Sequence, residues 1–212
     1  MDSELILIDI DGDTGIPLNT LCDDRDQHRI ARIGEGNEAA FESLYLDLHP
    51  RLFRFIYRMT RDQGLAEDLV NETLFLVWEK PEGFNGQSKL STWIFGIAYR
   101  KTLKAIAKGV RTSAAVPLDD LNEILTDRRV SATREVELEN LLTVAMASLS
   151  DEQRAVVELT FTEGLAYREI AVILGCPENT VKTRMFHARR KLEPYLALLK
   201  PDRDDYRHEE MT

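Results

Sequence analysis

The sequence predicts an all-α protein built from two small helical domains. Apolar residues recur every three or four positions over long stretches, which is the period of one face of an α-helix. Glycine and proline are scarce, at 11 and 7 of 212 residues, and few runs show the alternation typical of strands. An acidic stretch without apolar period separates the two periodic regions. We therefore expect two helical domains joined by a flexible linker.

Composition narrows the class of protein. Apolar residues make up 43% of the chain and charged residues 30%, as is usual for a soluble globular protein. No apolar run approaches the roughly 18 residues that a bilayer requires, and the acidic start "MDSELILIDID" is unlike a secretory signal. Cys22 and Cys176 have neither disulfide-framework nor metal-ligand spacing. We expect a cytoplasmic protein without membrane insertion, metal, cofactor or catalytic residues.

Residues 1–27 hold eight acids and one arginine, which predicts an acidic, poorly ordered tail. Within it, Asp9 and Asp11 resemble the first motif of haloacid-dehalogenase-type phosphatases, where the first aspartate is the nucleophile. That fold needs a parallel sheet, and nothing downstream predicts one. A calcium loop is also disfavoured, because Gly12 comes too early and Thr20 stands where the loop needs glutamate.

Residues 28–108 are predicted to form the first domain. Its helical segments read "EAAFESLYLDLHPRLFRFIYRMT", "AEDLVNETLFLVWEK" and "STWIFGIAYRKTLKAIAK", and Ser91 is the expected cap of the last one. Pro81, Gly83 and Gly86 break the pattern into the loop "PEGFNGQSKL". Between Glu82 and Asp119 there is no acid and there are six Lys/Arg residues. Aromatic residues among these cations suit unpaired nucleic acid; the alternative is that Trp93 and Phe95 simply belong to the core.

Residues 109–138 are predicted to form the linker and residues 139–196 the second domain, followed by an acidic tail at 197–212. In the second domain, Ser150 and Gln153 match a capping box. The following stretch, "YREIAVILGCPENTVKTRMFHARRKL", spaces Ala171, Gly175 and Val181 as in a helix-turn-helix. It carries six Lys/Arg against two acids, although the whole chain has a charge of −10. A cationic second helix indicates DNA contact; the alternative is a helical hairpin that only packs.

Together these motifs resemble an extracytoplasmic-function (ECF) sigma factor of bacterial RNA polymerase, of the sigma-70 family. The resemblance covers roughly residues 28–108 and 139–196. It implies that the chain is not an enzyme but binds core polymerase and promoter DNA. The first domain would be sigma domain 2, which binds the β′ clamp helices and captures the unwound minus-10 element. The second would be sigma domain 4, which binds the β flap and reads the minus-35 element. An anti-sigma factor is a further expected partner.

The resemblance also implies site residues, by matching positions. The expected polymerase-binding residues are Asp68, Asn71 and Glu72. The expected minus-10 residues are Phe84, Asn85, Gly86, Gln87, Ser88, Lys89, Leu90, Thr92, Trp93, Arg100, Lys101 and Lys104. The expected minus-35 residues are Lys182, Thr183, Arg184, Phe186, His187 and Arg189, of which Arg184 and Arg189 would hold phosphates.

Some positions depart from the family pattern. Tyr99 and Arg100 stand where Arg and Asn are common, which bears on the minus-10 preference. His187 replaces a more usual arginine, and Ala166 replaces a Ser/Thr cap. One alternative of another class is a sigma-mimicking protein that sequesters an anti-sigma factor without binding DNA.

Overall fold

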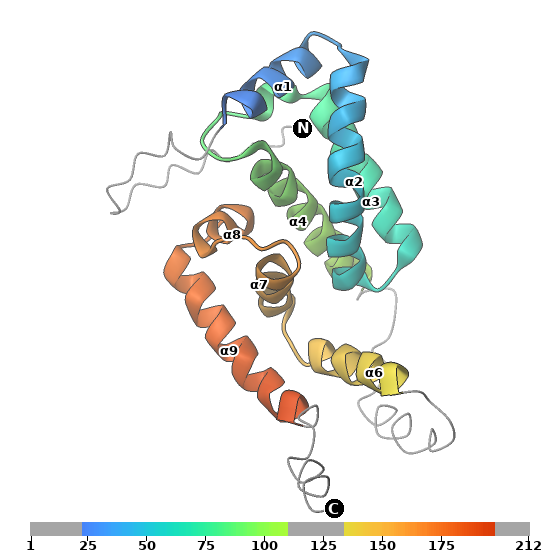
Figure 1. Cartoon of the computed structure of the whole chain (residues 1–212), viewed down its shortest axis with the longest axis vertical. Helices are drawn as coiled ribbons and strands as arrows, with labels where there is room; N and C mark the ends of the chain where they lie inside the picture. The colour runs from blue at the N-terminus through green and yellow to red at the C-terminus, as the bar shows by residue number, and fades with distance from the viewer. Residues whose placement is uncertain (1–22, 110–133, 198–212) are drawn as a thin grey trace, which may run out of the picture.

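The computed structural model describes residues 23–109 and 134–197, and all regular secondary structure in these ranges is helical (Figure 1). The helices of the first range are α1 (Asp24–Gly34), α2 (Glu38–Thr60), α3 (Gln63–Glu79), the short 3-10 helix η2 (Pro81–Gly83) and α4 (Leu90–Gly109). Those of the second range are α6 (Arg134–Ala147), α7 (Asp151–Phe161), α8 (Tyr167–Leu174) and α9 (Glu178–Ala197). The predicted all-α class is confirmed. The Asp9–Asp11 motif, Cys22 and residues 110–133 of the expected linker lie outside the described residues.

Side-chain caps fix where the helices of the first range begin. The Asn37 side chain accepts a hydrogen bond from the backbone N–H of Ala40 at the start of α2, and Asp62 accepts from Leu65 at the start of α3. Each cap satisfies one of the backbone donors that the first helical turn leaves unpaired. α1 starts at Asp24 with Asp23 as its cap, so helix already occupies the end of the segment predicted to be a tail.

The start of α4 differs from the sequence expectation. α4 begins at Leu90, so Ser91 lies inside the helix rather than at its cap. The backbone N–H of Leu90 instead donates to Asp26 Oδ2 of α1, at 2.8 Å. The cap comes from a residue 64 positions earlier, and it ties α1 to the beginning of α4.

The second range contains the predicted turn and cap signals. Ser150 and Gln153 form both hydrogen bonds of the predicted capping box at the start of α7. Gly175 ends α8 with φ 62, in the left-handed region that glycine adopts without a steric penalty. Val181 and Met185 of α9 are buried. Residues 134–138, which were predicted to belong to the linker, are the first residues of α6.

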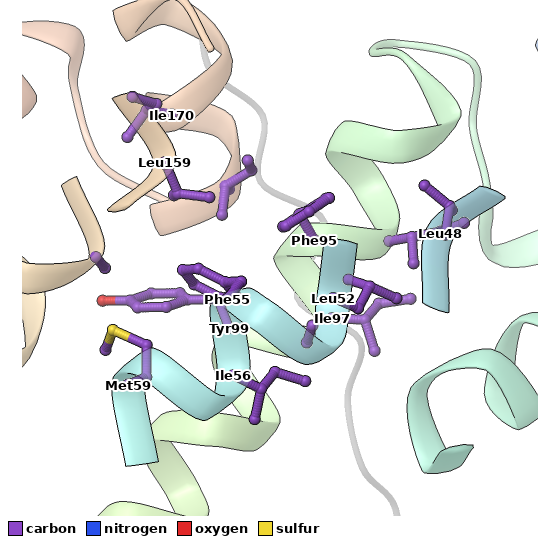
Figure 2. Packing of buried hydrophobic residues seen from close by; sticks show 14 of the residues in the cluster. Leu48, Leu52, Phe55, Ile56, Met59, Phe95, Ile97, Tyr99, Leu159 and Ile170 are labelled. Carbon is purple, nitrogen blue, oxygen red and sulfur yellow. The ribbon is translucent and has the colours of Figure 1, made fainter. Parts of the chain in front are cut away.

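The two helical regions share one hydrophobic core. The predicted flexible linker had implied two domains that do not pack against each other. α4 packs against α8, and α2 packs against α7. In Figure 2, Phe55 and Tyr99 of the first region and Leu159 and Ile170 of the second belong to one buried cluster. The two helical regions therefore pack against each other, with α4 in the middle of the described chain (Figure 1).

Candidate nucleic-acid interface

The outer face of α3 carries the three residues expected to bind polymerase. Asp68, Asn71 and Glu72 are all exposed. The Tyr45 hydroxyl donates to Asn71 Oδ1 at 3.2 Å, and Lys101 Nζ lies 2.8 Å from Glu72 Oε2. Asp68 has no ion-pair partner among residues 23–109 and 134–197. The face is thus acidic and polar, with one carboxylate open to a partner.

An apolar side chain extends this face. Phe75 lies three residues after Glu72 on α3 and is 58% exposed, and residues three apart share a helix face. Sequence reasoning missed Phe75, because the apolar period alone does not separate an exposed ring from a buried one. Aromatic residues are enriched in the buried centre of protein interfaces, so Phe75 suits contact with a protein partner.

The loop between η2 and α4 offers fewer free polar groups than its sequence suggested. Asn85 and Gln87 are exposed, and Asn85 Oδ1 accepts from the backbone N–H of Gln87 at 3.1 Å. Gly86 has φ 72, in the left-handed region. Ser88, in contrast, is buried and donates to the carbonyl oxygen of Lys89. The exposed amides are therefore the groups that can contact a base edge in this conformation.

Aromatic residues support this loop from behind. The rings of Phe84 and Trp93 lie 5.5 Å apart in a tilted arrangement. A Cβ on Gly83 would lie 3.3 Å from Trp93, so glycine lets the backbone approach the ring closely. Both rings are half-buried, which leaves part of each available for stacking.

Besides Ser88, two more of the expected minus-10 residues are buried. Leu90 is 1% exposed and Thr92 is 2% exposed, so neither side chain reaches solvent in this structure. The Thr92 hydroxyl is buried without a hydrogen-bond partner among the described residues. The sequence pattern placed these positions beside accessible ones but did not show that they face inward.

The cations of α4 differ in their surroundings. Lys104 is exposed, and Lys101 is paired with Glu72. Desolvation lowers the pKa of Arg100 from its ordinary value, although part of that side chain remains exposed. Its neighbour Tyr99 is buried, and this burial, with the nearby charge of Glu152, raises the pKa of Tyr99 to about 12.

α8 covers part of this expected DNA surface. Lys89 Nζ lies 2.7 Å from Glu169 Oε1 of α8. A Cβ on Gly96 of α4 would lie 3.7 Å from the backbone carbonyl oxygen of Ile173, so the two helices approach closely at a glycine. With the two regions packed together, the Glu169 carboxylate of the second region thus forms an ion pair with Lys89, a cation that was expected to contact DNA.

Two more ion pairs hold the regions together. Arg51 Nε lies 2.8 Å from Glu163 Oε2, and Arg58 Nη1 lies 3.0 Å from Glu158 Oε2. The two glutamate side chains are only 2% and 6% exposed. Removing one partner from such a pair leaves a charge buried without compensation, which is strongly destabilising.

The outer face of α9 presents most of the expected minus-35 residues. Lys182, Thr183, Phe186, His187 and Arg189 are exposed. Lys182 Nζ lies 2.8 Å from Glu178 Oε1, one helical turn earlier. The Phe186 ring packs edge-on against the His187 ring, with centroids 5.5 Å apart. This face combines cations and aromatic edges, and a helix of this kind fits the major groove.

Arg184 lies apart from that face. It is half-buried, and its Nη1 donates to Cys176 Sγ at 3.5 Å. Its charge lowers the pKa of the Cys176 thiol, but burial, the larger influence, raises it above the ordinary value. In this conformation Arg184 packs against the turn of the helix-turn-helix, so the expected phosphate contact would need a rotamer change.

Two other kinds of feature, a cluster of metal-ligating side chains and a membrane-spanning helix, are absent from the described residues. Within residues 23–109 and 134–197, no cluster of three His, Cys, Asp or Glu residues could hold a metal ion. None of the helices in those ranges combines the length and apolar character needed to cross a bilayer.

Comparisons with known proteins match both regions of the chain. Residues 44–112 match the family model "Sigma-70 region 2", and residues 139–192 match "Sigma-70, region 4". The ECF RNA polymerase sigma factor SigL of Mycobacterium tuberculosis is 32% identical over 169 residues, covering 77% of this chain and 93% of SigL. The RNA polymerase sigma-H factor of Pseudomonas aeruginosa is 27% identical over 187 residues, covering 83% of this chain and 96% of that factor.

A solved structure extends the comparison. The sigma factor RpoE of Bartonella quintana, in complex with the anti-sigma factor NepR, is 25% identical. It superposes with a TM-score of 0.57, covering 76% of this chain and 98% of RpoE.

Proposed function

Since the chain belongs to the ECF sigma factors of the sigma-70 family, we propose a division of promoter recognition between its two helical regions. The chain is a sigma factor that binds core RNA polymerase and directs promoter-specific transcription initiation. In our proposal, residues 28–108 anchor the polymerase and capture the minus-10 element, and residues 139–196 read the minus-35 element. The observation that carries it is the match of both sigma regions, in order, on a chain whose α9 exposes a cationic face.

Each expected site residue keeps its role in this proposal unless its burial argues otherwise. Asp68 and Glu72 would contact polymerase, with Phe75 added from the structure. Asn85 and Gln87 would bind the flipped base, because they are the exposed amides of the loop. We assign Leu90 and Thr92 to the support of that loop, since both are buried.

ECF sigma factors are non-enzymatic initiation factors, and we infer that this chain likewise leaves the chemistry of RNA synthesis to the core enzyme. We also infer a cytoplasmic location, because that is where its polymerase partner works. RpoE was solved with an anti-sigma factor, and we propose that this chain too has an anti-sigma partner.

The alternative, a sigma mimic that only sequesters an anti-sigma factor, is not favoured. Such a mimic has no need of a DNA-reading face, yet Lys182, Phe186 and Arg189 are exposed on α9. The phosphatase alternative is not favoured either, because that fold needs a parallel sheet and the described residues form helices only.

Run-off transcription tests the proposal. Purified chain and bacterial core polymerase would be incubated with a library of genomic fragments, and the 5′ ends of the transcripts would be mapped. We expect starts that lie downstream of one shared pair of motifs and that are absent with core alone. Transcripts without a shared motif, or none above core alone, would refute promoter recognition. A Lys182→Ala, Arg189→Ala variant is the matched control for the minus-35 half.

A further inference from the structure

A hollow between α1 and the start of α2 has walls of two kinds. Its volume is about 310 Å³, and no acid belongs to its lining. Residues three or four apart share one face of a helix, so the α1 side of the hollow is a single basic face, made of Arg25, His28, Arg29 and Arg32. The α2 side includes the small side chains of Ala39 and Ala40. The hollow therefore suits a ligand that is anionic on one side and apolar on the other.

Two arginines of the basic face keep donors for such a ligand. Arg29 is already held, because its Nη2 lies 2.6 Å from Asp47 Oδ2. The Arg25 side chain is 93% exposed, and its ion pair within the described residues is 4.0 Å long. Arg32 is exposed and has no ion-pair partner in residues 23–109 and 134–197. An available guanidinium thus lies on each side of a fixed one.

The segment that precedes α1 carries the complementary charge. Residues 1–22 hold five acids and no Lys, Arg or His. They join the described chain at Asp23, two positions before the first arginine of the basic face. The acidic segment is therefore tethered beside a cationic hollow of the same chain.

The sequence of this segment also matches the two walls. Residues 7–13 read "LIDIDGD", in which aliphatic residues alternate with acids. Alternate side chains of an extended segment point to opposite sides. In that conformation Asp9, Asp11 and Asp13 would lie on one side, and Ile8 and Ile10 on the other. The alternation that resembled a phosphatase strand thus fits the hollow between α1 and α2.

The spacing of the acids is close to that of the arginines. Alternate residues of an extended segment are about 6.6–6.8 Å apart. Along the axis of α1, Arg25 and Arg29 are separated by about 6 Å, and Arg29 and Arg32 by about 4.5 Å. Long side chains can accommodate this difference. Residues 14–22 span up to about 30 Å when extended, which is enough to turn back over α1.

We propose that residues 7–13 of this chain bind in the hollow between α1 and α2, antiparallel to α1. Asp13 pairs with Arg25 and Asp9 with Arg32, while the isoleucines pack toward the alanines of α2. A short tether gives an effective concentration in the millimolar range, so weak, exposed ion pairs suffice to hold the segment. The bound segment neutralises the basic face of α1, and an anionic partner has to displace it. This inference does not depend on the proposed function.

Amide hydrogen exchange of the full chain tests the proposal. Exchange would be followed by NMR, residue by residue, for α1 and the start of α2 at neutral pH and low salt. The variant is Asp9→Asn with Asp13→Asn. The matched control is Asp2→Asn with Glu4→Gln, which removes the same number of charges from the same segment.

We expect α1 amides to exchange about fivefold faster in the variant than in wild type, as for the loss of two exposed ion pairs, and the control to match wild type. The difference should disappear at about 1 M salt, where charges are screened within about 3 Å. Equal exchange in all three proteins, or the same increase in variant and control, would overturn the inference. A difference that grew with protein concentration would assign the segment to a second copy of the chain, and would overturn the intramolecular site.

A double-mutant cycle tests the pairing itself. Asp13→Arg should speed the exchange of α1 amides in the wild-type background and should slow it in the background of Arg25→Asp, because the ion pair is then restored with its charges exchanged. The same effect in both backgrounds would show that the two side chains do not meet. Deletion of residues 198–212 should leave exchange unchanged, and an increase equal to that of the variant would make the other acidic segment the occupant instead.

Displacement gives an independent measurement. Inorganic tripolyphosphate would be titrated into the free chain and followed by the backbone NMR signals of α1. The Asp9→Asn, Asp13→Asn variant should bind it several-fold more tightly than wild type, because no segment has to leave the hollow. Equal affinities of the two proteins would contradict the neutralisation of the basic face.

Discussion

Lys89 and Glu169 form an ion pair, at 2.7 Å, that joins the loop between η2 and α4 to α8, the first helix of the helix-turn-helix. Glu169 Oε2 also accepts the backbone N–H of Ala166, and so serves the start of α8, where Ala166 lacks a capping side chain. One carboxylate thus stabilises the second region internally and attaches it to the first. A DNA phosphate that binds Lys89 must compete with the Glu169 carboxylate for it.

Acid should weaken this junction. Burial alone would raise the pKa of Glu169, but the hydrogen bonds from Lys89 and from the Ala166 backbone outweigh it, and the pKa lies below the ordinary 4.5. A carboxyl group whose pKa is lower in the folded chain contributes stability above its unfolded pKa and loses it as pH falls through the folded value. Thermal melts of wild type should therefore decline below about pH 4.5, and Glu169→Gln should flatten part of that decline. Parallel pH profiles for the two proteins would contradict this role.

Asp68→Lys should weaken the binding of core polymerase. The change reverses the unpaired carboxylate of the α3 face and leaves the buried Leu69 in place, so helicity and melting temperature should hold. We expect a loss of about tenfold or more in affinity, equivalent to roughly 1.4 kcal/mol. Asp68 is a better target than Glu72, because Glu72 pairs with Lys101 and a change of Glu72→Lys would place a second cation beside Lys101. Glu35→Lys, at the exposed C-cap of α1, is the control, and equal binding by all three proteins would remove the α3 face from the polymerase interface.

Lys182 and Arg189 should play different roles on DNA. Lys182→Ala should cost about 1–3 kcal/mol of discrimination at one minus-35 base pair if its contact is direct. Its pairing with Glu178 does not oppose this, because exposed ion pairs within one helix contribute little. Arg189→Ala should weaken binding to all sequences about equally and flatten the salt dependence. Binding measured across a set of single-base promoter variants separates the two, and an identical uniform loss would mean that Lys182 reads no base.

The exposed amides of the loop should act at strand opening. Asn85→Ala with Gln87→Ala should leave polymerase binding intact and lower the permanganate reactivity of unpaired thymines near the start site. A promoter already melted across the minus-10 region should restore part of the activity. Ser88→Ala is the internal control, because Ser88 is buried and should affect stability more than opening. Full-rate opening of wild-type promoters by the double variant would end the base-capture assignment.

Local signals predicted the fold well. The Ser150–Gln153 box, the Gly175 turn and the buried positions of α9 each depend on residues a few positions apart, so spacing and residue type suffice to find them.

Contacts between segments that lie far apart in the chain could not be predicted from the sequence. The sequence does not show that Glu158 and Glu163 turn inward to arginines about a hundred residues away, because on a helical wheel an acid is assigned to solvent. Nor does it show that Asp26 caps α4 in place of Ser91. The burial of Leu90 and Thr92 follows from the packing of α4, which the motif alone does not determine.

The core shared by α2, α4, α7 and α8 has a thermodynamic consequence. Suppose that polymerase and promoter bind only molecules in which the two regions have separated. Their apparent affinity is then the intrinsic affinity multiplied by the fraction of separated molecules, so a population of 1% would weaken binding about a hundredfold. Polymerase, by holding the regions apart, would remove this penalty for DNA, and the two ligands would assist each other without touching. The strength of the junction would then set how much sigma factor must accumulate before its promoters respond.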